Sequence, residues 1–457
     1  MGRNWPNVTL DSICKIKSGK RLPKGHELID VPTKYPYIRL VDVHDGVILA
    51  KELKYLTAEA HEKIQRYIVN ENDVCLAIVG HTIGMVFFVD SKWNNVNLTE
   101  NAARITDVDS KFNPKFIYYY LISPFGQAEI ISRTVGSAQG KLPLYNIKSI
   151  ELPCIPRSEQ DSIVHILDCL DKKITFNRQI NQTLEQMAQA LFKSWFVDFD
   201  PVIDNSLDAG NEIPEPLQAR AELRQTVRAS QDFQPLPADV RALFPAEFEE
   251  SELGWVPKGW NSTPVIELIE LIGGGTPKTS IDEYWNGDIP WFSVVDAPND
   301  CDIFVIDTEK HITQLGVDSS STRILRKGTT IISARGTVGK CAFVARPMAM
   351  NQSCYGVIGV EGVTDEFVYY LLKQSVQELQ QRSHGSVFST ITRDTFRSIQ
   401  VPFSGGSLTR SFSSFVSIMF EKVLANNLQN IELIQLRDTL LPKLISGEFR
   451  LDEIPSP

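Results

Sequence analysis

A glycine-rich segment at residues 273–279 is the part of this sequence closest to a recognised ligand-binding motif. Its sequence, GGGTPKT, combines glycines with a lysine and two threonines, the composition of loops that bind phosphate through backbone N–H groups. Two features argue against that function. No glycine stands directly before Lys278, and Pro277 lacks the backbone N–H that such a loop would use there. We therefore interpret the segment as a turn.

The other reactive side chains do not form a catalytic group either. Residues 307–310, with the sequence DTEK, lack the additional upstream carboxylate that a metal-dependent nuclease site would need. The seven histidines are scattered, and the seven cysteines include no CxxC pair. The motifs GxGxxG, GxSxG and HExxH are missing, as is the Asn/Asp-Pro-Pro-aromatic tetrapeptide expected of an amino-methyltransferase. We expect no enzymatic activity and no structural metal.

Cysteine usage and the N-terminal residues predict where the protein works. Cysteines without a disulfide framework are typical of a reducing compartment, which points to the cytoplasm. Residues 1–6 do not show the apolar core of a secretory signal. The uncharged run at residues 74–89 is short for a bilayer span and contains Gly80 and Gly84. We expect no association with a membrane.

Two regions of the chain contain the same ordered series of landmark residues. The elements of these two regions must therefore position the candidate residues. Trp5 and Gly19 recur as Trp260 and Gly274, at a constant offset of 255 residues. Later landmarks follow the same order down to Pro153 and its counterpart Pro402. A period of this length is too long for a solenoid. It predicts two similar domains of about 150 residues, a normal domain size.

Each copy has the pattern of a mixed α/β domain in which strands predominate. A short apolar helix is expected at residues 10–16 and again at residues 265–272. A turn with glycine and several strands follow, and residues 74–89 and 329–345 each predict a strand, a tight turn and a second strand. A further short helix is expected around Tyr119 and its counterpart Tyr369.

Each copy continues into a long amphipathic segment. Residues of the predicted seam alternate in steps of four and three from Ile163 to Trp195, and again from Phe412 to Leu444, as a coiled coil requires. Both seams contain two Asn residues at equivalent places, which would penalise slipped registers by on the order of 1 to 3 kcal/mol. We predict two helices of roughly 55 Å that pack antiparallel and relate the domains by a pseudo-two-fold axis.

The charge is unevenly distributed along the chain. The net charge is −10 overall, and the first 158 residues are net +4, whereas residues 159–256 are net −10 and residues 257–406 net −3. Residues 198–256 are rich in proline and acidic residues, so we expect an exposed connector with one helix at residues 217–229. A nucleic-acid partner usually requires a basic surface, and the second copy shows no obvious basic stripe.

Three segments carry a resemblance to a known family. They are residues 191–201 (LFKSWFVDFDP), 251–260 (SELGWVPKGW) and 436–447 (LRDTLLPKLISG). In combination with the repeat, they resemble the DNA-specificity subunit of type I restriction-modification systems over the whole chain. The resemblance implies an α+β protein in which two target-recognition domains each bind one half of a bipartite double-stranded DNA sequence. Two long antiparallel helices would separate these domains.

The resemblance also implies partners and a division of the chain. Two adenine-methyltransferase subunits and the motor-nuclease subunits would carry S-adenosylmethionine, ATP and Mg²⁺, with no cofactor in this chain. The expected parts are two target-recognition domains at residues 1–158 and 257–407, two spacer helices at 159–197 and 408–446, a connector at 198–256 and a tail at 447–457.

Loops at equivalent places in the two copies are the candidate DNA contacts, because glycines allow a close approach and the polar side chains suit bases and phosphates. They contribute Lys20, Arg21, Lys24, His81, Thr82, Gln139 and Lys141 in the first copy and Thr276, Lys278, Thr279, Arg335, Thr337, Ser386, Phe388 and Ser389 in the second. Arg39 and Ser293 are further candidates, at equivalent positions of the strands expected at residues 37–41 and 291–295. The alternatives are a solvated turn for the segments after Gly19 and Gly274, a β-hairpin without a ligand for those with His81 and Arg335, and a plain surface loop for those with Gln139 and Ser386.

Apolar residues near the helix ends are candidates for contacts with partner subunits. They are Phe192, Trp195, Phe196, Phe199, Leu440, Leu441 and Leu444. Burial within the chain itself is the alternative, and the two interpretations are compatible. A second hypothesis for the whole chain is a coiled-coil adaptor whose two domains bind proteins. A third, a restriction enzyme in its own right, is disfavoured by the missing catalytic tetrapeptide.

Overall fold

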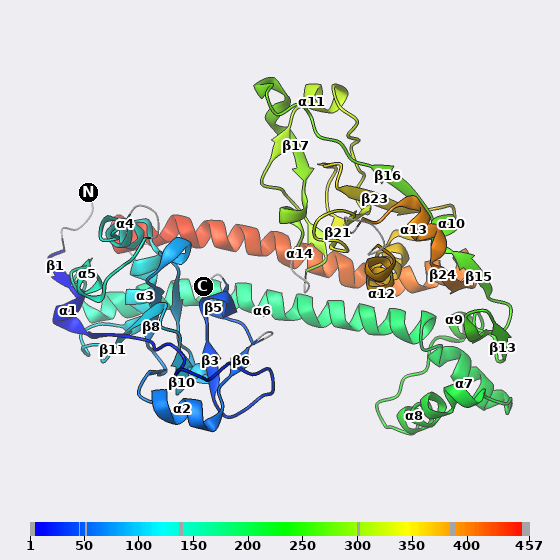
Figure 1. The fold of residues 1–457 in the computed structure, drawn as a ribbon, viewed down its shortest axis with the longest axis horizontal. Helices are drawn as coiled ribbons and strands as arrows, with labels where there is room; N and C mark the ends of the chain where they lie inside the picture. Colours follow the sequence, from blue (N-terminus) through cyan, green and yellow to red (C-terminus); the bar gives the residue numbers. More distant parts are fainter. Residues whose placement is uncertain are drawn as a thin grey trace. The chain divides into compact units, whose positions relative to one another are not determined.

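The computed structural model divides the chain into two compact units. One comprises residues 1–175 with 430–457, and the other comprises residues 176–429 (Figure 1). Within the described part of the chain, no helix combines the length and the apolar character that crossing a lipid bilayer demands. The described residues are 5–44, 46–50, 53–136, 140–298, 302–383 and 390–449.

The first unit is built around two four-stranded sheets, with strand orders β2-β11-β8-β9 and β6-β3-β10-β7. Its strands are β1 Asn7–Thr9, β2 Lys15–Ser18, β3 Pro36–Ile38, β4 Val43–His44, β5 Val47–Ile48, β6 Lys54–Tyr55, β7 Ile68–Val69, β8 Val74–Ala77, β9 Val86–Phe88, β10 Val96–Leu98, β11 Ala102–Thr106 and β12 Glu151–Pro153. Its shorter helices are α1 Leu10–Ile13, α2 Ala58–Ile64, α3 Pro114–Ile122, α4 Pro124–Ser132 and α5 Leu144–Lys148.

The α/β domain of the second unit has sheets of five and three strands, ordered β16-β23-β20-β21-β18 and β19-β17-β22. Its strands are β15 Asn261–Pro264, β16 Ile269–Gly273, β17 Trp285–Phe292, β18 Phe304–Val305, β19 His311–Ile312, β20 Thr330–Ser333, β21 Cys341–Val344, β22 Ala349–Met350, β23 Cys354–Gly359 and β24 Gln400–Phe403. Its helices are α10 Val265–Leu268, α11 Gln314–Asp318, α12 Asp365–Ser383 and α13 Arg393–Ser398.

The two domains share a topology, which confirms the predicted α+β fold class. The sheet β2-β11-β8-β9 corresponds strand by strand to β16-β23-β20-β21, and all of these neighbours pair antiparallel. In the second sheet, β3 runs parallel to β10 as β17 does to β22. The first and last strands of each domain also pair, β1 with β12 and β15 with β24. Each copy of the repeat is therefore closed by its own ends.

The predicted helices at residues 10–16 and 265–272 are wrong in length. Each forms a single turn, α1 or α10, and the chain then enters strand β2 or β16. The residues after the turn alternate between exposed and buried positions, as Lys15 and Ile16 or Glu270 and Leu271 show. A period of two favours a strand over a helix. The apolar spacing was correct, but its later part belongs to a sheet.

Two 40-residue helices, α6 Arg157–Phe196 and α14 Gly406–Ile445, pack against each other as the seams predicted. Every predicted seam position on both helices is buried or half-buried. In the second unit the Nδ2 group of Asn181 donates to Oδ1 of Asn427 at 2.6 Å, and Asn426 donates to Oδ1 of Asn181 at 2.8 Å. Asn177 also donates to Oε1 of Gln429 at 2.9 Å. As the residue number rises along α6, the number of its partner on α14 falls, so the helices are antiparallel.

The connector is not an exposed linker, contrary to prediction. The predicted helix is present as α8 Gln218–Arg228, and the connector contains further elements: α7 Asp200–Ala209, α9 Ala238–Arg241, β13 Phe248–Ser251 and β14 Gly254–Pro257. Arg220 donates to both carboxylate oxygens of Asp200 at 2.7 Å. Arg224 donates to both oxygens of Asp204, at 3.0 and 2.5 Å. Four-residue spacing on both helices aligns these pairs. Composition suggested exposure because it does not show that the acidic residues face arginines.

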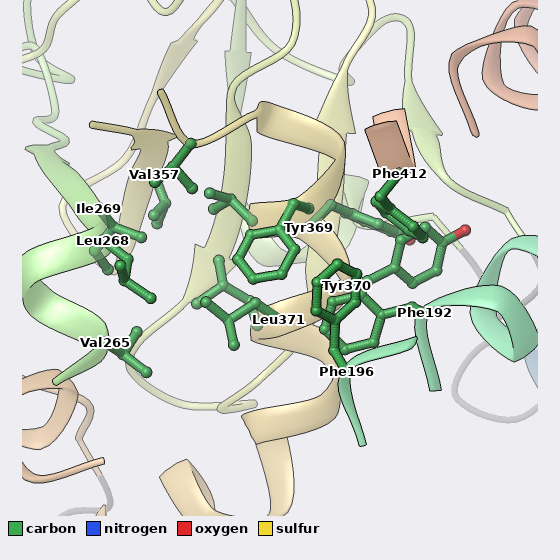
Figure 2. Packing of buried hydrophobic residues seen from close by; sticks show 14 of the residues in the cluster. Phe192, Phe196, Val265, Leu268, Ile269, Val357, Tyr369, Tyr370, Leu371 and Phe412 are labelled. Atoms are coloured by element: carbon green, nitrogen blue, oxygen red, sulfur yellow. The ribbon is translucent and has the colours of Figure 1, made fainter. Parts of the chain in front are cut away.

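The second unit contains one large apolar core that includes residues of both long helices. Figure 2 shows Phe192 and Phe196 of α6 and Phe412 of α14 gathered beside Tyr370 of α12. The main core of the first unit instead joins its sheet and α3 to aliphatic residues of the long helices, including Ile163. In both units the helical pair is part of the core.

Candidate nucleic-acid interface

The first candidate loop joins two antiparallel strands in each unit, β8 to β9 and β20 to β21. His81, Arg335 and Thr337 are exposed on these loops, whereas the hydroxyl of half-buried Thr82 donates to the carbonyl oxygen of Val79 at 2.9 Å. Four glycines provide the left-handed backbone that the tight turns require. They are Gly80 (φ +66°), Gly84 (+100°), Gly336 (+76°) and Gly339 (+91°).

A second candidate loop lies directly beside the first in the first unit. The backbone N–H of Gly80 donates to the carbonyl oxygen of Gly140 at 2.9 Å, and Val79 forms a β-bridge with Lys141. The structure therefore brings exposed His81 and exposed Lys141 to one edge of the domain. In water both side chains can turn towards a phosphate or a base edge.

The second unit repeats this arrangement. Arg335 forms a β-bridge with Thr390, and Ile391 donates its N–H to the carbonyl oxygen of Ala334 at 3.0 Å. The same two loops are thus adjacent in both copies. Four of the predicted contacts lie on these loops but outside the described residues, namely Gln139, Ser386, Phe388 and Ser389.

The third candidate segment begins after strand β2 or β16, and a glycine is required at its start. A Cβ atom on Gly19 would lie 2.0 Å from the carbonyl oxygen of Thr99, and one on Gly274 would lie 2.0 Å from that of Asn351. Real side chains never approach backbone so closely, so the shared glycine of the repeat allows a backbone contact. The turn at residues 273–279 leads to a short 3-10 helix at Asp282–Tyr284. It does not open a long helix, as a phosphate-binding loop would.

Cations on the third segment differ in how they are held. Lys20, Arg21 and Lys24 are exposed, and Nε of Arg21 donates to Oε1 of Glu100 at 2.8 Å. This hydrogen bond raises the pKa of Arg21. Burial acts to raise the pKa of Glu100, but its contacts, led by Arg21, outweigh that effect and lower it. Lys20 also lies over the ring of Tyr67, 5.3 Å from its centroid.

The corresponding segment of the second unit carries less charge. Thr276 donates from its hydroxyl to the side chain of Gln352, and Lys278 and Thr279 are exposed. The two copies therefore present equivalent segments with different side chains. The backbone geometry at the shared glycine is thus kept, while the side chains that follow it differ.

Arg39 and Ser293 have structural roles at equivalent positions. Arg39 forms an ion pair with buried Asp42, with Nη2 2.6 Å from Oδ1, and Asp42 also accepts the backbone N–H of Arg39. Ser293 makes the same reciprocal capping arrangement with Asp296. Each residue begins a 3-10 turn at the point where the sequence predicted that a strand would continue. These side chains already stabilise the turn, which makes them weaker candidates for base contacts.

The residues proposed for subunit contacts are largely buried within the chain. Trp195 is 1% exposed and Phe192 3%, and both pack in the core of the second unit. Phe196, Phe199, Leu441 and Leu444 are also buried, whereas Leu440 is half-buried. The structure thus shows the burial that the sequence offered as the alternative. A contact with another subunit at these residues stays a prediction.

Helices α3 and α12 anchor each domain on the long helix α6 through contacts that sequence reasoning missed. In the first unit the hydroxyl of Tyr119 donates to Oδ2 of Asp171 at 2.7 Å, and Lys115 forms an ion pair with Asp168. The available signal was spacing. Lys115 and Tyr119 are four residues apart on one helix face, and the two aspartates are three apart on the other helix.

The same type of anchor occurs in the second unit. The hydroxyl of Tyr370 donates to Oε2 of Glu185 at 2.5 Å, and Nζ of Lys373 lies 2.6 Å from Oε1. Burial and the neighbouring Glu185 raise the pKa of Tyr370. The tyrosine pairs served in the sequence only as landmarks of the repeat, and the structure shows that they also hold the domains on α6.

The described residues contain no cluster of three or more His, Cys, Asp or Glu side chains suited to a metal ion. The DTEK segment is an ion-paired turn, in which Asp307 binds Arg346 at 2.7 Å and His311 at 2.9 Å. These contacts agree with its interpretation as a surface turn. Recognition through loops is the function that this geometry supports.

Comparison with known proteins decides the family. Residues 2–186 and 257–404 match the family model described as the type I restriction modification DNA specificity domain. The chain belongs to this family. It is a DNA-specificity subunit of a type I restriction-modification system, which decides against the adaptor hypothesis. Such subunits are non-catalytic and carry no cofactor, since S-adenosylmethionine and ATP bind to partner subunits.

Similar proteins agree with this assignment. The specificity subunit of the type I restriction enzyme HindI from Haemophilus influenzae is 29% identical over 403 residues, which cover 83% of this chain and 87% of that protein. The MjaIX specificity subunit from Methanocaldococcus jannaschii is 31% identical over 198 residues, 43% of this chain and 46% of that protein. A crystal structure of a type I S subunit from M. genitalium has a TM-score of 0.54 at 18% identity, with 96% of both chains covered. That structure supports the fold of this specificity subunit.

Proposed function

We propose that each α/β domain of this specificity subunit binds one half of a bipartite DNA sequence and that the helical pair sets the distance between the halves. The observation that carries the proposal is the duplicated pair of adjacent loops, which present His81 and Lys141 in one unit and Arg335 in the other. One good bidentate contact to a base contributes about 1 to 3 kcal/mol of discrimination. Two separate domains add their discrimination.

The DNA-binding residues would be the exposed members of the three loop segments. In the first domain they are Lys20, Arg21, Lys24, His81 and Lys141, with Thr82 beside them. In the second they are Thr276, Lys278, Thr279, Arg335 and Thr337. Guanidinium and ammonium groups suit guanine and phosphate, and hydroxyls suit phosphate or either type of base.

The helices would act as a spacer because each is continuous and contributes to both units. At about 1.5 Å per residue, a helix of this length spans roughly 60 Å, between one and two turns of B-DNA. The paired asparagines support one register of the helical pair, since a shifted register would leave buried amides without partners. We assign residues 1–158 and 257–407 to the reading domains, 159–197 and 408–446 to the spacer, 198–256 to the connector and 447–457 to the tail.

We place the subunit in a cytoplasmic complex with two adenine-methyltransferase subunits and, in the full assembly, motor-nuclease subunits. Docking would use apolar side chains that the long helices leave exposed: Phe176 is 56% exposed, Met187 51% and Ile418 69%. Met187→Asp should then reduce co-purification of the methyltransferase. Gln182→Asp, at an exposed polar position of the same helix, should have no effect. Equal retention of the methyltransferase by both variants would contradict this docking surface.

Domain exchange tests the reading function. Residues 1–158 are replaced by the corresponding domain of another specificity subunit, and methylated adenines are mapped in DNA exposed to the complex with methyltransferase subunits. One half of the target should change while the other half and the spacing stay the same. The reciprocal exchange of residues 257–407 should change the other half. An alteration of both halves by either exchange would show that the domains do not read independently.

A further inference from the structure

In each domain one glutamine side chain holds the first candidate loop, which joins β8 to β9 or β20 to β21. In the first unit, Nε2 of Gln127 on α4 donates to the carbonyl oxygen of Gly84 at 2.9 Å and to that of Leu121 at 2.8 Å. Gly84 belongs to the loop that presents His81, and Leu121 is in the last turn of α3. One side-chain amide therefore joins the loop to the helix that anchors the domain on α6.

The second unit makes the same connection at a different place in the sequence. Nε2 of Gln380 on α12 donates to the carbonyl oxygen of Val338 at 2.9 Å, in the loop that presents Arg335. Gln127 lies eight residues after Tyr119, whereas Gln380 lies eleven residues after Tyr369. Counting along the repeat would therefore have selected Gln377, whose side chain is exposed.

The difference in position follows from the two helices. In the first unit the helix is interrupted at Ser123, which caps α4 with its side chain while Pro124 removes a backbone donor. In the second unit α12 runs without interruption from Asp365 to Ser383. In the first unit the loop is therefore reached by a glutamine of a new helix, α4. In the second unit it is reached by a glutamine that lies nearly one turn further along the continuous helix α12.

The loop glycines leave room for these side chains because they have no Cβ atom. A Cβ atom on Gly84 would lie 2.8 Å from Oε1 of Gln127, and one on Gly339 would lie 2.7 Å from Cγ1 of Val376 and 3.2 Å from Nε2 of Gln380. Both glycines also have a positive φ. The turn and the glutamine therefore fit each other in both copies.

We propose that Gln127 and Gln380 are positioning residues that fix each DNA-reading loop relative to the helix anchored on α6. Through α3 and α12, the loop is tied to the anchors made by Tyr119 and Tyr370. Base recognition needs donors and acceptors held within a narrow geometry. The inference rests on the proposed function and specifies how the loop is held in place for it.

The test uses the complex of the full chain with its methyltransferase subunits and a DNA library with single mismatches in each half of the mapped target. Gln380→Met keeps the length of the side chain and removes the donor. It should raise methylation of sites mismatched in the second half about tenfold relative to the wild type and leave discrimination in the first half unchanged. Gln127→Met should show the opposite pattern. Gln377→Met is the matched control and should behave as the wild type.

Gln380→Glu, which removes the donor at constant size, provides a second variant, and thermal unfolding of each complex is recorded in parallel. Relaxation confined to one half, without a change in non-specific DNA affinity, supports positioning. Unchanged discrimination in both halves, or an equal loss in both, overturns it. Absence of any bipartite methylation by the wild-type complex would instead overturn the proposed function itself.

Discussion

The two α/β domains join the helical pair through different chemistry. In the second unit the junction is aromatic: Phe192 and Phe412 have ring centroids 5.8 Å apart, and Tyr370 lies 5.9 Å from Phe192. In the first unit aliphatic side chains are supplemented by charges, with Asp171 accepting from Tyr119 at 2.7 Å and from Arg437 at 2.9 Å.

This difference shows which features the repeat preserves. Strand order, the close-contact glycines and a tyrosine hydroxyl bonded to a carboxylate of α6 occur in both copies. A lysine paired with a carboxylate of α6 lies beside that bond in both copies, whereas the apolar side chains around it differ. Geometry is thus common to the two domains, whereas the stability of each junction has a separate source. Both junctions include a lysine paired with a carboxylate of α6. The aromatic junction should nevertheless depend mainly on packing, whereas the junction of the first unit, where Arg437 also pairs with Asp171, should depend more on charge.

The largest expected effect is the loss of Trp195 from the aromatic junction. Trp195 is 1% exposed and contacts the rings of Phe412 and Phe244. Trp195→Ala should lower the free energy of unfolding of the second unit by about 3 to 5 kcal/mol, because it leaves a cavity in a packed core. Chemical denaturation, monitored by hydrogen exchange of the amides of the second unit, measures this change. Met187→Ala, at an exposed position of the same helix, should change stability by less than about 0.5 kcal/mol. Equal effects of the two substitutions would contradict the account.

A smaller effect is expected at the charged junction. Burial acts to lower the pKa of Arg437, but its hydrogen bond to Asp171 and the nearby Asp438 outweigh this and raise it. Arg437→Met should destabilise the first unit by about 1.5 kcal/mol, since a partly buried carboxylate loses a charged donor. Lys422→Met, at an exposed position of the same helix, should be nearly neutral in the same denaturation experiment. A neutral result for Arg437→Met would show that packing alone holds this junction.

The smallest effect is a difference in acid sensitivity. Burial acts to raise the pKa of Asp168, but hydrogen bonds from Lys115 and Lys172 outweigh it and lower the pKa. A carboxyl group whose pKa is lowered by folding stabilises the fold at pH values above its pKa in the unfolded chain, about 3.9. This contribution is lost as the pH falls through the pKa that the group has in the folded protein. The amides of α3 should therefore lose protection below about pH 4, before those of α12, in pulse-labelled hydrogen exchange. Simultaneous loss, or earlier loss in α12, would remove the distinction between the junctions.

The sequence predicted the parts of the fold that depend on a regular pattern. The seams of α6 and α14 and the strand-turn-strand loops at residues 74–89 and 329–345 were correct because apolar spacing determines them. The positions of Gln127 and Gln380 were beyond prediction, since a break at Pro124 in one copy alone shifts which residue reaches the loop. The folded connector was missed for a related reason: the Asp–Arg pairs join helices that are separate in sequence.

The central claim is that two independent readers are held apart by the helical pair. It is tested most directly by inserting one seam repeat of seven residues into each long helix. The insertion is placed within residues 174–181 of α6 and within residues 426–433 of α14. The insertion lengthens each helix by about 10 Å, or roughly three base pairs of DNA at about 3.4 Å each. Mapping of methylated adenines should then show both half-sites unchanged and the gap between them about three base pairs longer. Retention of the original gap would contradict the account.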